Sequence, residues 1–375
     1  MSTRWLAIGV LFALAGHTAA QAVHLVGPGQ HTTIQAAIDL AAPGDVVLVD
    51  AGVYPTFHVG KSLTITAMPS ALVQVVTTGA VTFTLLPDDR VHLGGLDIQA
   101  AGVTVEGGLV SMERCTLRPH RGLRLVDCVA ALRWCAVDAA IGSAVQAENT
   151  HLHASDSTFS TTAGSFVPDE FAAVKIEAAS TCQLSLCTLF GTWPAGLLPS
   201  VALHVANSTA TIERIWLVEC TLLGGFGPGS SVGPSVVAPP APAPAPVRMH
   251  RCTTAGALIG SIASGPVVGL HTPVDMQIGA LFTTTMISDP GHLLVLYIGT
   301  NLVGPFPLWF IEQPVFGFYD VQFFAWVLAN GQGRADFPLV LPNNPALRHQ
   351  VIWWRGLDLS ASPTQLTQVF LSLVQ

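Results

Sequence analysis

A short motif recurs through the middle of this chain and restricts what the chain can fold into. Each copy has an apolar residue, any residue, an apolar residue, two further residues, Cys or Ser, usually Thr, and usually an apolar residue. The copies are Val110–Leu117, Leu152–Phe159, Cys182–Leu189, Ile215–Leu222 and Val247–Thr254. Looser copies end at Cys128 and Cys135, and because these two lie so close together in the chain we expect one of them to be coincidental.

The alternation inside each copy predicts a β-strand. Successive copies are about 20 to 33 residues apart, with no helical pattern between them. One strand cannot bury its apolar face alone, whereas stacked copies form a continuous core. The repeat therefore predicts an all-β chain wound as a right-handed parallel β-helix, in which each coil adds about 4.8 Å along the axis.

One helix pattern stands before these strands, in the segment TIQAAIDLAAPGDVVLVDAGVY, residues 33–54. Thr32 followed by Gln35 predicts a capping box at the start of the helix. Four apolar residues recur with helical spacing and share one face, namely Ile34, Ala37, Ile38 and Ala41. Because the open end of a β-helix exposes unpaired backbone groups, we expect this short N-terminal helix to cap the core.

The capping segment resembles the N-terminal cap of pectin-lyase-like right-handed β-helix proteins. The resemblance covers about 25 residues closely and the following 220 or so through the repeat pattern. It implies a right-handed parallel β-helix of the exported bacterial type. It implies no single activity, because this fold carries lyases, hydrolases, epimerases, adhesins and inert scaffolds.

The rest of the chain divides into three predicted segments. Residues 1–22 read as a signal peptide, with Arg4 before an apolar stretch and cleavage after Ala20 or Ala22, and predict a secreted or cell-surface protein. Residues 23–272 form the predicted β-helix, with a Pro/Ala-rich loop at 234–246. Residues 273–375 are rich in aromatic residues and turns, which predicts a C-terminal antiparallel β-sandwich, and they resemble a C-terminal module of exported bacterial proteins.

Composition excludes several classes of partner. Only 10% of the residues are charged and the net charge is -8, which argues against nucleic acid. The uncharged stretches 252–274 and 290–311 contain Gly and Pro, which disfavour a membrane-spanning helix in the mature chain. His151 and His153 share one strand face near Asp156, but their spacing fixes no third ligand, so we expect no metal site.

Seven cysteines occur in the chain, none in a C-x-x-C pair. Most of them recur in one slot of the repeat, which favours a ladder of small buried thiols over disulfides or zinc ligands. We therefore expect most of the cysteines to be free.

An arginine cluster gives the best hint of function. Five arginines fall close together, with His120 among them: Arg114, Arg118, Arg121, Arg124 and Arg133. In the frame of the repeat, Arg114 and Arg124 face outward, whereas Arg118 and Arg121 lie on a turn. Guanidinium groups on the flank of a β-helix can bind uronate carboxylates in bidentate fashion. We expect four of them to be ligand-binding residues (Arg114, Arg118, Arg121 and Arg124), and the partner to be an acidic polysaccharide or a cell-surface glycan.

The segment RPHRG, residues 118–122, resembles the arginine segment of pectate lyases. The resemblance implies that Arg118 or Arg121 is the base that removes the C5 proton while calcium neutralises the carboxylate. The nearby acids Glu113, Asp127 and Asp138 form no recognisable calcium constellation.

Two functions therefore remain open. The leading expectation is an exported, non-catalytic β-helix protein with a surface, structural or glycan-binding role, and no cofactor. The alternative is a polysaccharide lyase that acts on uronate polymers by arginine-assisted β-elimination, with calcium. Polygalacturonase chemistry has little support, because the chain lacks both the N-T-D and the G-H-G motifs of those hydrolases.

Overall fold

A computed structural model gives the structure of most of the chain. It describes residues 22–162, 172–178, 180–191, 200–206, 215–225, 232–239, 247–260, 262–264, 269–271, 275–276, 278–299, 302–306, 315–318, 321–344, 351–361, 365–366 and 370–374. The predicted signal peptide lies outside these residues except for Ala22, and so do residues 240–246 of the Pro/Ala-rich segment. The chain divides into two compact units, one ending at Gly269 and the other beginning at Leu270.

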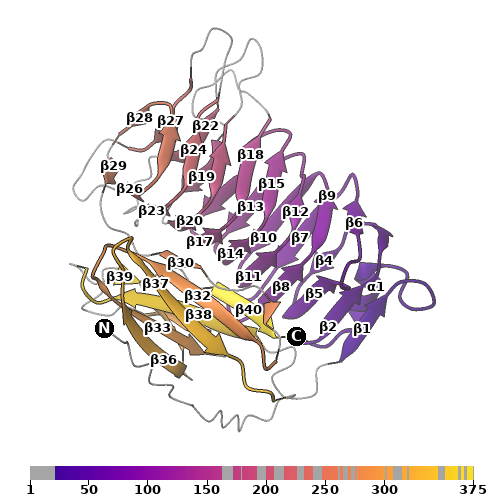
Figure 1. The fold of residues 1–375 in the computed structure, drawn as a ribbon. Coiled ribbons are helices and arrows are strands. Elements are labelled where there is room, and N and C mark those ends of the chain that lie inside the picture. Colours follow the sequence, from indigo (N-terminus) through magenta and orange to yellow (C-terminus); the bar gives the residue numbers. More distant parts are fainter. Residues whose placement is uncertain are drawn as a thin grey trace. The chain divides into compact units, whose positions relative to one another are not determined.

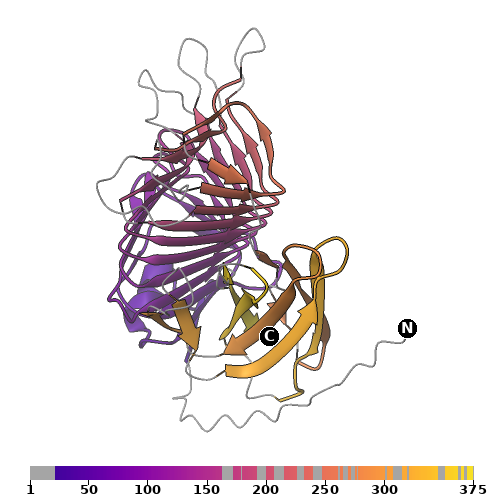
Figure 2. The same cartoon turned by 90° about the vertical axis from the view of Figure 1, so that its left-hand side faces the viewer.

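The first unit is a parallel β-helix built from three sheets (Figures 1 and 2). Each coil passes through sheets A, B and C in turn. Sheet A contains β1 (Val23–Val26), β2 (Val46–Val49), β5 (Leu63–Ala67), β8 (Arg90–Gly94), β11 (Leu109–Glu113), β14 (Val129–Arg133), β17 (His151–Ser155), β20 (Thr181–Ser185), β23 (Ile215–Val218), β26 (Val247–His250) and β29 (Ile262–Ser264).

The other two sheets follow the same coils. Sheet B contains β3 (Gly52–Tyr54), β6 (Val73–Val76), β9 (Leu96–Gln99), β12 (Thr116–Leu117), β15 (Ala136–Ala139), β18 (Thr158–Thr161), β21 (Thr188–Phe190), β24 (Thr221–Leu223) and β27 (Thr253–Ala255). Sheet C contains β4 (His58–Val59), β7 (Ala80–Thr84), β10 (Gly102–Glu106), β13 (Leu123–Val126), β16 (Val145–Glu148), β19 (Ala172–Glu177), β22 (Val201–Val205), β25 (Val236–Val237) and β28 (Leu258–Ile259).

Neighbouring coils pair in parallel and in register. In sheet A, for example, Met112 of β11 pairs with Leu93 of β8 on one side and with Leu132 of β14 on the other. All three side chains are buried in one core cluster that extends through the unit. Like side chains therefore stack at equivalent positions, which explains the repeat and confirms the predicted β-helix.

The helix α1 (Ile34–Leu40) caps the first coil. Ile34, Ala37 and Ile38 are buried in the same core cluster as Val47 of β2, as the helical pattern predicts. The start of the helix differs by one residue from the prediction. Its N-cap is Thr33, whose hydroxyl oxygen accepts a hydrogen bond from the N–H of Ala36 at 3.1 Å.

The predicted capping box is therefore not formed. Gln35 instead donates from Nε2 to Asp39 at 2.7 Å, and its Oε1 accepts from the N–H of His58 at 2.7 Å. The second of these bonds ties the helix to β4 in sheet C, where the first coil ends.

The second unit consists mainly of antiparallel sheets, as expected. One sheet has the order β30 (Gly269–His271), β32 (Leu281–Ile287) and β37 (Arg334–Val340). Another has the order β31 (Asp275–Met276), β40 (Phe370–Val374), β38 (Val351–Asp358), β33 (Leu293–Gly299) and β36 (Val321–Leu328), with β39 (Gln365–Leu366) paired to β38. In a separate two-stranded sheet, β34 (Leu302–Phe306) pairs antiparallel with β35 (Val315–Phe318).

An edge-to-face contact between Phe282 and Trp354, with ring centroids 5.7 Å apart, joins the two larger sheets of this unit. Trp354 is fully buried, so it forms part of the core between them. In the part of the chain that the structure describes, no helix is long and apolar enough to cross a membrane.

Candidate functional site: the outer face of sheet B

The A–B corner, meaning the two residues between a sheet A strand and the next sheet B strand, bends the chain sharply in each coil from β11 to β27. The first of the two residues has a positive φ, which is 51° at Arg114, 48° at Trp134 and 49° at Asp156. Residues with a side chain rarely adopt this conformation, so the paired strands on both sides impose it. The corner residues of successive coils therefore form a column along the β-helix, which we call the corner column.

The second corner residue is the Cys or Ser of the repeat. Five cysteines occupy this slot, and we call them the thiol ladder: Cys115, Cys135, Cys187, Cys220 and Cys252. Cys135 donates to the carbonyl oxygens of Arg133 and Met112, both at 3.3 Å, so one thiol satisfies backbone groups on its own coil and on the preceding coil. All seven cysteines of the chain are free, as the repeat predicts.

As expected, only one of Cys128 and Cys135 occupies the Cys slot of the repeat. Cys135 belongs to the thiol ladder at the A–B corner, whereas Cys128 follows Asp127 at the other tight corner, between sheets C and A. There the Cys128 thiol lies 3.7 Å from the hydroxyl of Thr150 on the next coil. The two cysteines flank a single sheet A strand, β14, so they belong to one coil and not to separate turns.

Outward side chains of sheet B and its corner column form a polar surface, which we call the sheet B face. Inward positions such as Leu117, Val137 and Phe159 are fully buried, so their neighbours along each strand point to solvent. Its central outward residues are Asp97, Thr116, Arg118, Trp134, Ala136, Asp138, Asp156, Thr158 and Ser160. Ala136 lies in register between Thr116 and Thr158, which places the smallest side chain at the centre of this surface.

Hydrogen bonds fix the polar part of the sheet B face. Asp97 accepts bonds from the amide nitrogens of Gln74 at 3.4 Å and Gln99 at 3.3 Å, and its carboxylate lies 3.6 Å from the Arg118 guanidinium. On the other side of Ala136, Ser160 donates to Asp138 at 3.1 Å. The carboxylates of Asp97 and Asp138 are thus held in place by hydrogen bonds, and both side chains remain partly exposed.

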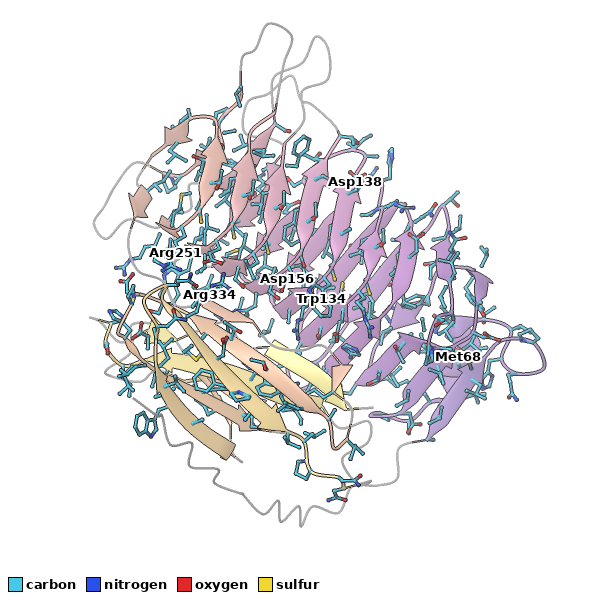
Figure 3. All side chains as sticks on the ribbon, in the orientation of Figure 1. Met68, Trp134, Asp138, Asp156, Arg251 and Arg334 are labelled. Carbon is cyan, nitrogen blue, oxygen red and sulfur yellow. The ribbon has the colours of Figure 1, made fainter. Side chains whose placement is uncertain are left out.

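Trp134 provides the aromatic part of the sheet B face. Its side chain is 40% exposed, which is unusual for so large an apolar group. The guanidinium of Arg133 lies over the indole, 5.0 Å from the ring centroid, and this cation–π contact fixes the orientation of the ring. Figure 3 shows Trp134 near Asp156, whereas Asp138, farther along β15, lies apart from both.

The four predicted ligand-binding arginines separate into two pairs. Arg114 and Arg118 flank Thr116 on the outward side of β12, and both are exposed, so they belong to the sheet B face. Arg121 lies in the turn that follows, as the sequence predicts, and Arg124 lies on β13 of sheet C. The structure therefore does not bring all four guanidinium groups together, although all four are exposed.

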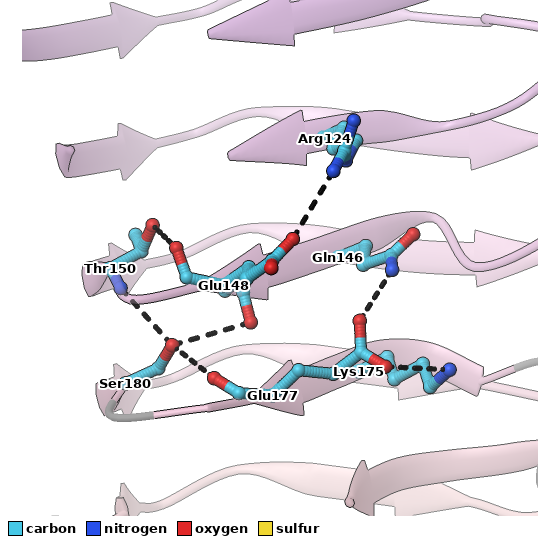
Figure 4. Close-up of polar contacts among 8 residues, drawn as sticks. Arg124, Gln146, Glu148, Thr150, Lys175, Glu177 and Ser180 are labelled. Atoms are coloured by element: carbon cyan, nitrogen blue, oxygen red, sulfur yellow. Dashed lines mark hydrogen bonds and ion pairs between the residues drawn. The ribbon is translucent and has the colours of Figure 1, made fainter. Parts of the chain in front are cut away.

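Arg124 belongs instead to a polar network on the outside of sheet C (Figure 4). Its guanidinium pairs with Glu148 at 3.2 Å. Lys175 pairs with Glu177 at 2.9 Å, and Gln146 donates to the same carboxylate. Burial raises the pKa of Glu177, but the hydrogen bonds from Lys175 and Gln146 outweigh burial and leave the pKa below its usual value. These groups satisfy one another, which is typical of a structural network.

The carboxylates considered for calcium lie on different faces. Glu113 ends β11 in sheet A, Asp127 lies at the C–A corner and Asp138 lies in β15 of sheet B. They therefore do not fit one calcium ion, which needs several converging oxygen ligands. His151 and His153 lie on β17 of sheet A. Among the described residues, no group of three or more His, Cys, Asp or Glu side chains could hold a metal ion.

Ser288, His292 and Asp358 form a cluster in the second unit that sequence analysis did not find. The carboxylate of Asp358 accepts from the Ser288 hydroxyl, lies 2.8 Å from Nδ1 of His292, and accepts from the N–H groups of Ser360 and Ala361. The hydroxyl of Ser288 faces Nδ1 too, at 3.4 Å. The Ser288 hydroxyl and the Asp358 carboxylate thus both face Nδ1 of His292, so the imidazole cannot relay a proton between them. The cluster instead connects the ends of neighbouring strands.

The fold places this protein among the parallel β-helix proteins. Comparison with protein-family models, with curated proteins and with solved structures finds no match. Any assignment of function therefore depends on the surface chemistry of the chain.

Proposed function

We propose that this protein is an exported, non-catalytic β-helix scaffold of the pectin-lyase-like type, and that its sheet B face binds a glycan. The exposed indole of Trp134 carries this proposal. The apolar face of a sugar ring packs on an aromatic ring, and the polar groups around Trp134 can bond the hydroxyl groups at the edge of the sugar. Cation–π contact with Arg133 orders the indole in advance, which lowers the entropy cost of binding.

The charges of the sheet B face favour a neutral glycan. Three guanidinium groups stand near three carboxylates: those of Arg114, Arg118 and Arg133, and those of Asp97, Asp138 and Asp156. Arg118 already has Asp97 as a partner at 3.6 Å. A polyuronate would meet no net positive charge here, whereas a neutral chain rich in hydroxyl groups finds both donors and acceptors.

The lyase alternative stays a prediction that no described contact favours. It requires several oxygen ligands that converge on calcium beside Arg118 or Arg121, whereas Glu113, Asp127 and Asp138 lie on different faces. An assay for unsaturated products from polygalacturonate and alginate, with and without calcium, addresses it directly. Formation of such products, abolished by Arg121→Ala, would replace the binding proposal with catalysis.

Affinity electrophoresis through gels that contain neutral or uronate polysaccharides tests the binding proposal. We expect retardation by at least one neutral polysaccharide, and we expect Trp134→Ala to weaken binding at least ten-fold, which corresponds to about 1.4 kcal/mol. Thr158→Ala removes a neighbouring hydroxyl and should weaken binding less.

Two variants serve as controls. Arg124→Ala removes an exposed guanidinium group on sheet C, outside the sheet B face. Trp326→Ala removes an indole that is 64% exposed in the second unit. Both should bind as the unaltered protein does. If no polysaccharide binds, or if Trp134→Ala binds with unchanged affinity, the sheet B face is not the site.

A further inference from the structure

The thiol ladder reaches the end of the β-helix at Cys252. Cys187, Cys220 and Cys252 occupy the same corner slot in three successive coils, directly before the paired residues Thr188, Thr221 and Thr253. Cys187 and Cys220 are buried, whereas Cys252 is only half-buried. The last two thiols thus form a neighbouring pair that a small solute can reach from one side.

In-register stacking opposes a disulfide between these two cysteines. Parallel strands are about 4.8 Å apart, and in-register Cβ atoms share this separation. The Cβ atoms of a disulfide are about 3.5–4.5 Å apart, with a mean of about 3.8 Å. Closing the gap would distort both coils, so the thiols remain available as ligands even in an oxidising compartment.

The same spacing suits a metal ion held between two sulfur atoms. Two thiolate–metal bonds of about 2.3 Å, placed on opposite sides of an ion, span about 4.6 Å. We propose that Cys220 and Cys252 bind a thiophilic divalent ion as a linear dithiolate, with mercuric ion as the representative of this class. The ion displaces one proton from each thiol, so that Hg²⁺ and two S–H groups give S–Hg–S and two H⁺.

Charge and ligand number restrict the ion to this class. A divalent ion with two thiolates is neutral, so it leaves no unpaired charge in an apolar core. Zinc requires four ligands, and the described residues offer no group of three or more His, Cys, Asp or Glu side chains that could hold a metal ion. A two-coordinate thiophilic ion is the one that this pair can satisfy.

Loss of the thiol protons leaves the carbonyl groups of Val218 and His250 satisfied. Cys220 donates to the carbonyl of Val218 at 3.4 Å, and that carbonyl also accepts from the N–H of Leu186 at 2.9 Å. Cys252 donates to the carbonyl of His250 at 3.4 Å, and that carbonyl also accepts from the N–H of Glu219 at 2.9 Å. Metal binding therefore exchanges weak thiol donors for metal bonds without orphaning these backbone groups.

Titration of the folded full chain with Hg²⁺, followed by proton release and by the sulfur-to-mercury charge-transfer absorption, tests the proposal. The first equivalent should release two protons and raise the thermal unfolding midpoint. In a Cys187→Ser background, which removes the next thiol of the ladder, Cys220→Ser and Cys252→Ser should each release one proton only. Because two tethered ligands act at a high effective concentration, either variant should lose at least about a hundred-fold in affinity against a competing monothiol.

Serine is a matched replacement in this ladder. Ser157 fills the same corner slot and donates to the carbonyl of Ser155 at 2.7 Å, so we expect both serine variants to fold. Cys128→Ser, at the other corner, should retain full binding. The proposal is overturned if Hg²⁺ unfolds the protein, if either ladder variant binds like the unaltered chain, or if mild oxidation yields a Cys220–Cys252 disulfide.

Discussion

The capping role of α1 gives the most direct test of the fold. Ile34 is fully buried at the start of this helix, in the same cluster as the first coil. Truncating a buried isoleucine to alanine removes apolar contacts and leaves a cavity, which typically costs about 2–5 kcal/mol. Alanine has the higher helix propensity and returns a few tenths of a kcal/mol. We therefore expect Ile34→Ala to lower the free energy of unfolding by about 3 kcal/mol.

Urea unfolding followed by circular dichroism measures this loss. Leu40→Ala is the matched control, because Leu40 lies in the same helix and is 68% exposed. Its effect should stay within about 0.5 kcal/mol of zero. If the two variants had equal stability, or if Ile34→Ala cost less than about 1 kcal/mol, the helix would not act as a packed cap.

Three further measurements follow from the coils. Gly122 has a φ of +80°, and an added Cβ would lie 1.9 Å from the carbonyl oxygen of Ser143, so Gly122→Ala should lower stability in urea by about 2 kcal/mol or more; unchanged stability would contradict this geometry. The hydrogen bond from His24, aided by backbone N–H groups and opposed by burial, lowers the pKa of Asp45 below 3.8. The ionised Asp45 carboxylate therefore stabilises the folded chain fully above pH 3.8, and this stabilisation disappears as the pH falls through the lowered pKa. We expect Asp45→Asn to be less stable than the unaltered protein at neutral pH. It should also lose less stability on acidification, as measured by urea unfolding at several pH values. Thiol titration should find all seven cysteines free after unfolding without reductant, and three disulfides in that titration would refute the ladder.

Stacking explains why the architecture could be predicted from sequence. Positions such as Met112 and Leu132 must be apolar in each coil because they meet the same core, so the repeat is visible in the chain. The choice between Thr32 and Thr33 as N-cap could not be made, because both hydroxyl groups suit the role and one backbone turn decides between them.

The candidate site was only partly visible from the sequence. Arg114 and Arg118 were predicted as binding residues, but Trp134 was not, because Cys135 was not assigned with certainty to the repeat. Trp134 precedes Cys135 just as Arg114 precedes Cys115. Placing Cys135 in the repeat would have aligned the indole with the arginine. Which faces Arg121 and Arg124 occupy depends on where each coil bends, and spacing alone does not give that.

The constancy of the A–B corner has a consequence for protein engineering. Chain length between coils varies where sheet B passes to sheet C, as between Thr161 of β18 and Ala172 of β19. The A–B corner instead stays at two residues from β11 to β27, because its second residue must reach the carbonyls of two coils. Foreign peptides should therefore be tolerated when they are inserted in the connections from sheet B to sheet C. A single residue inserted at an A–B corner would instead disrupt the pairing of the coils.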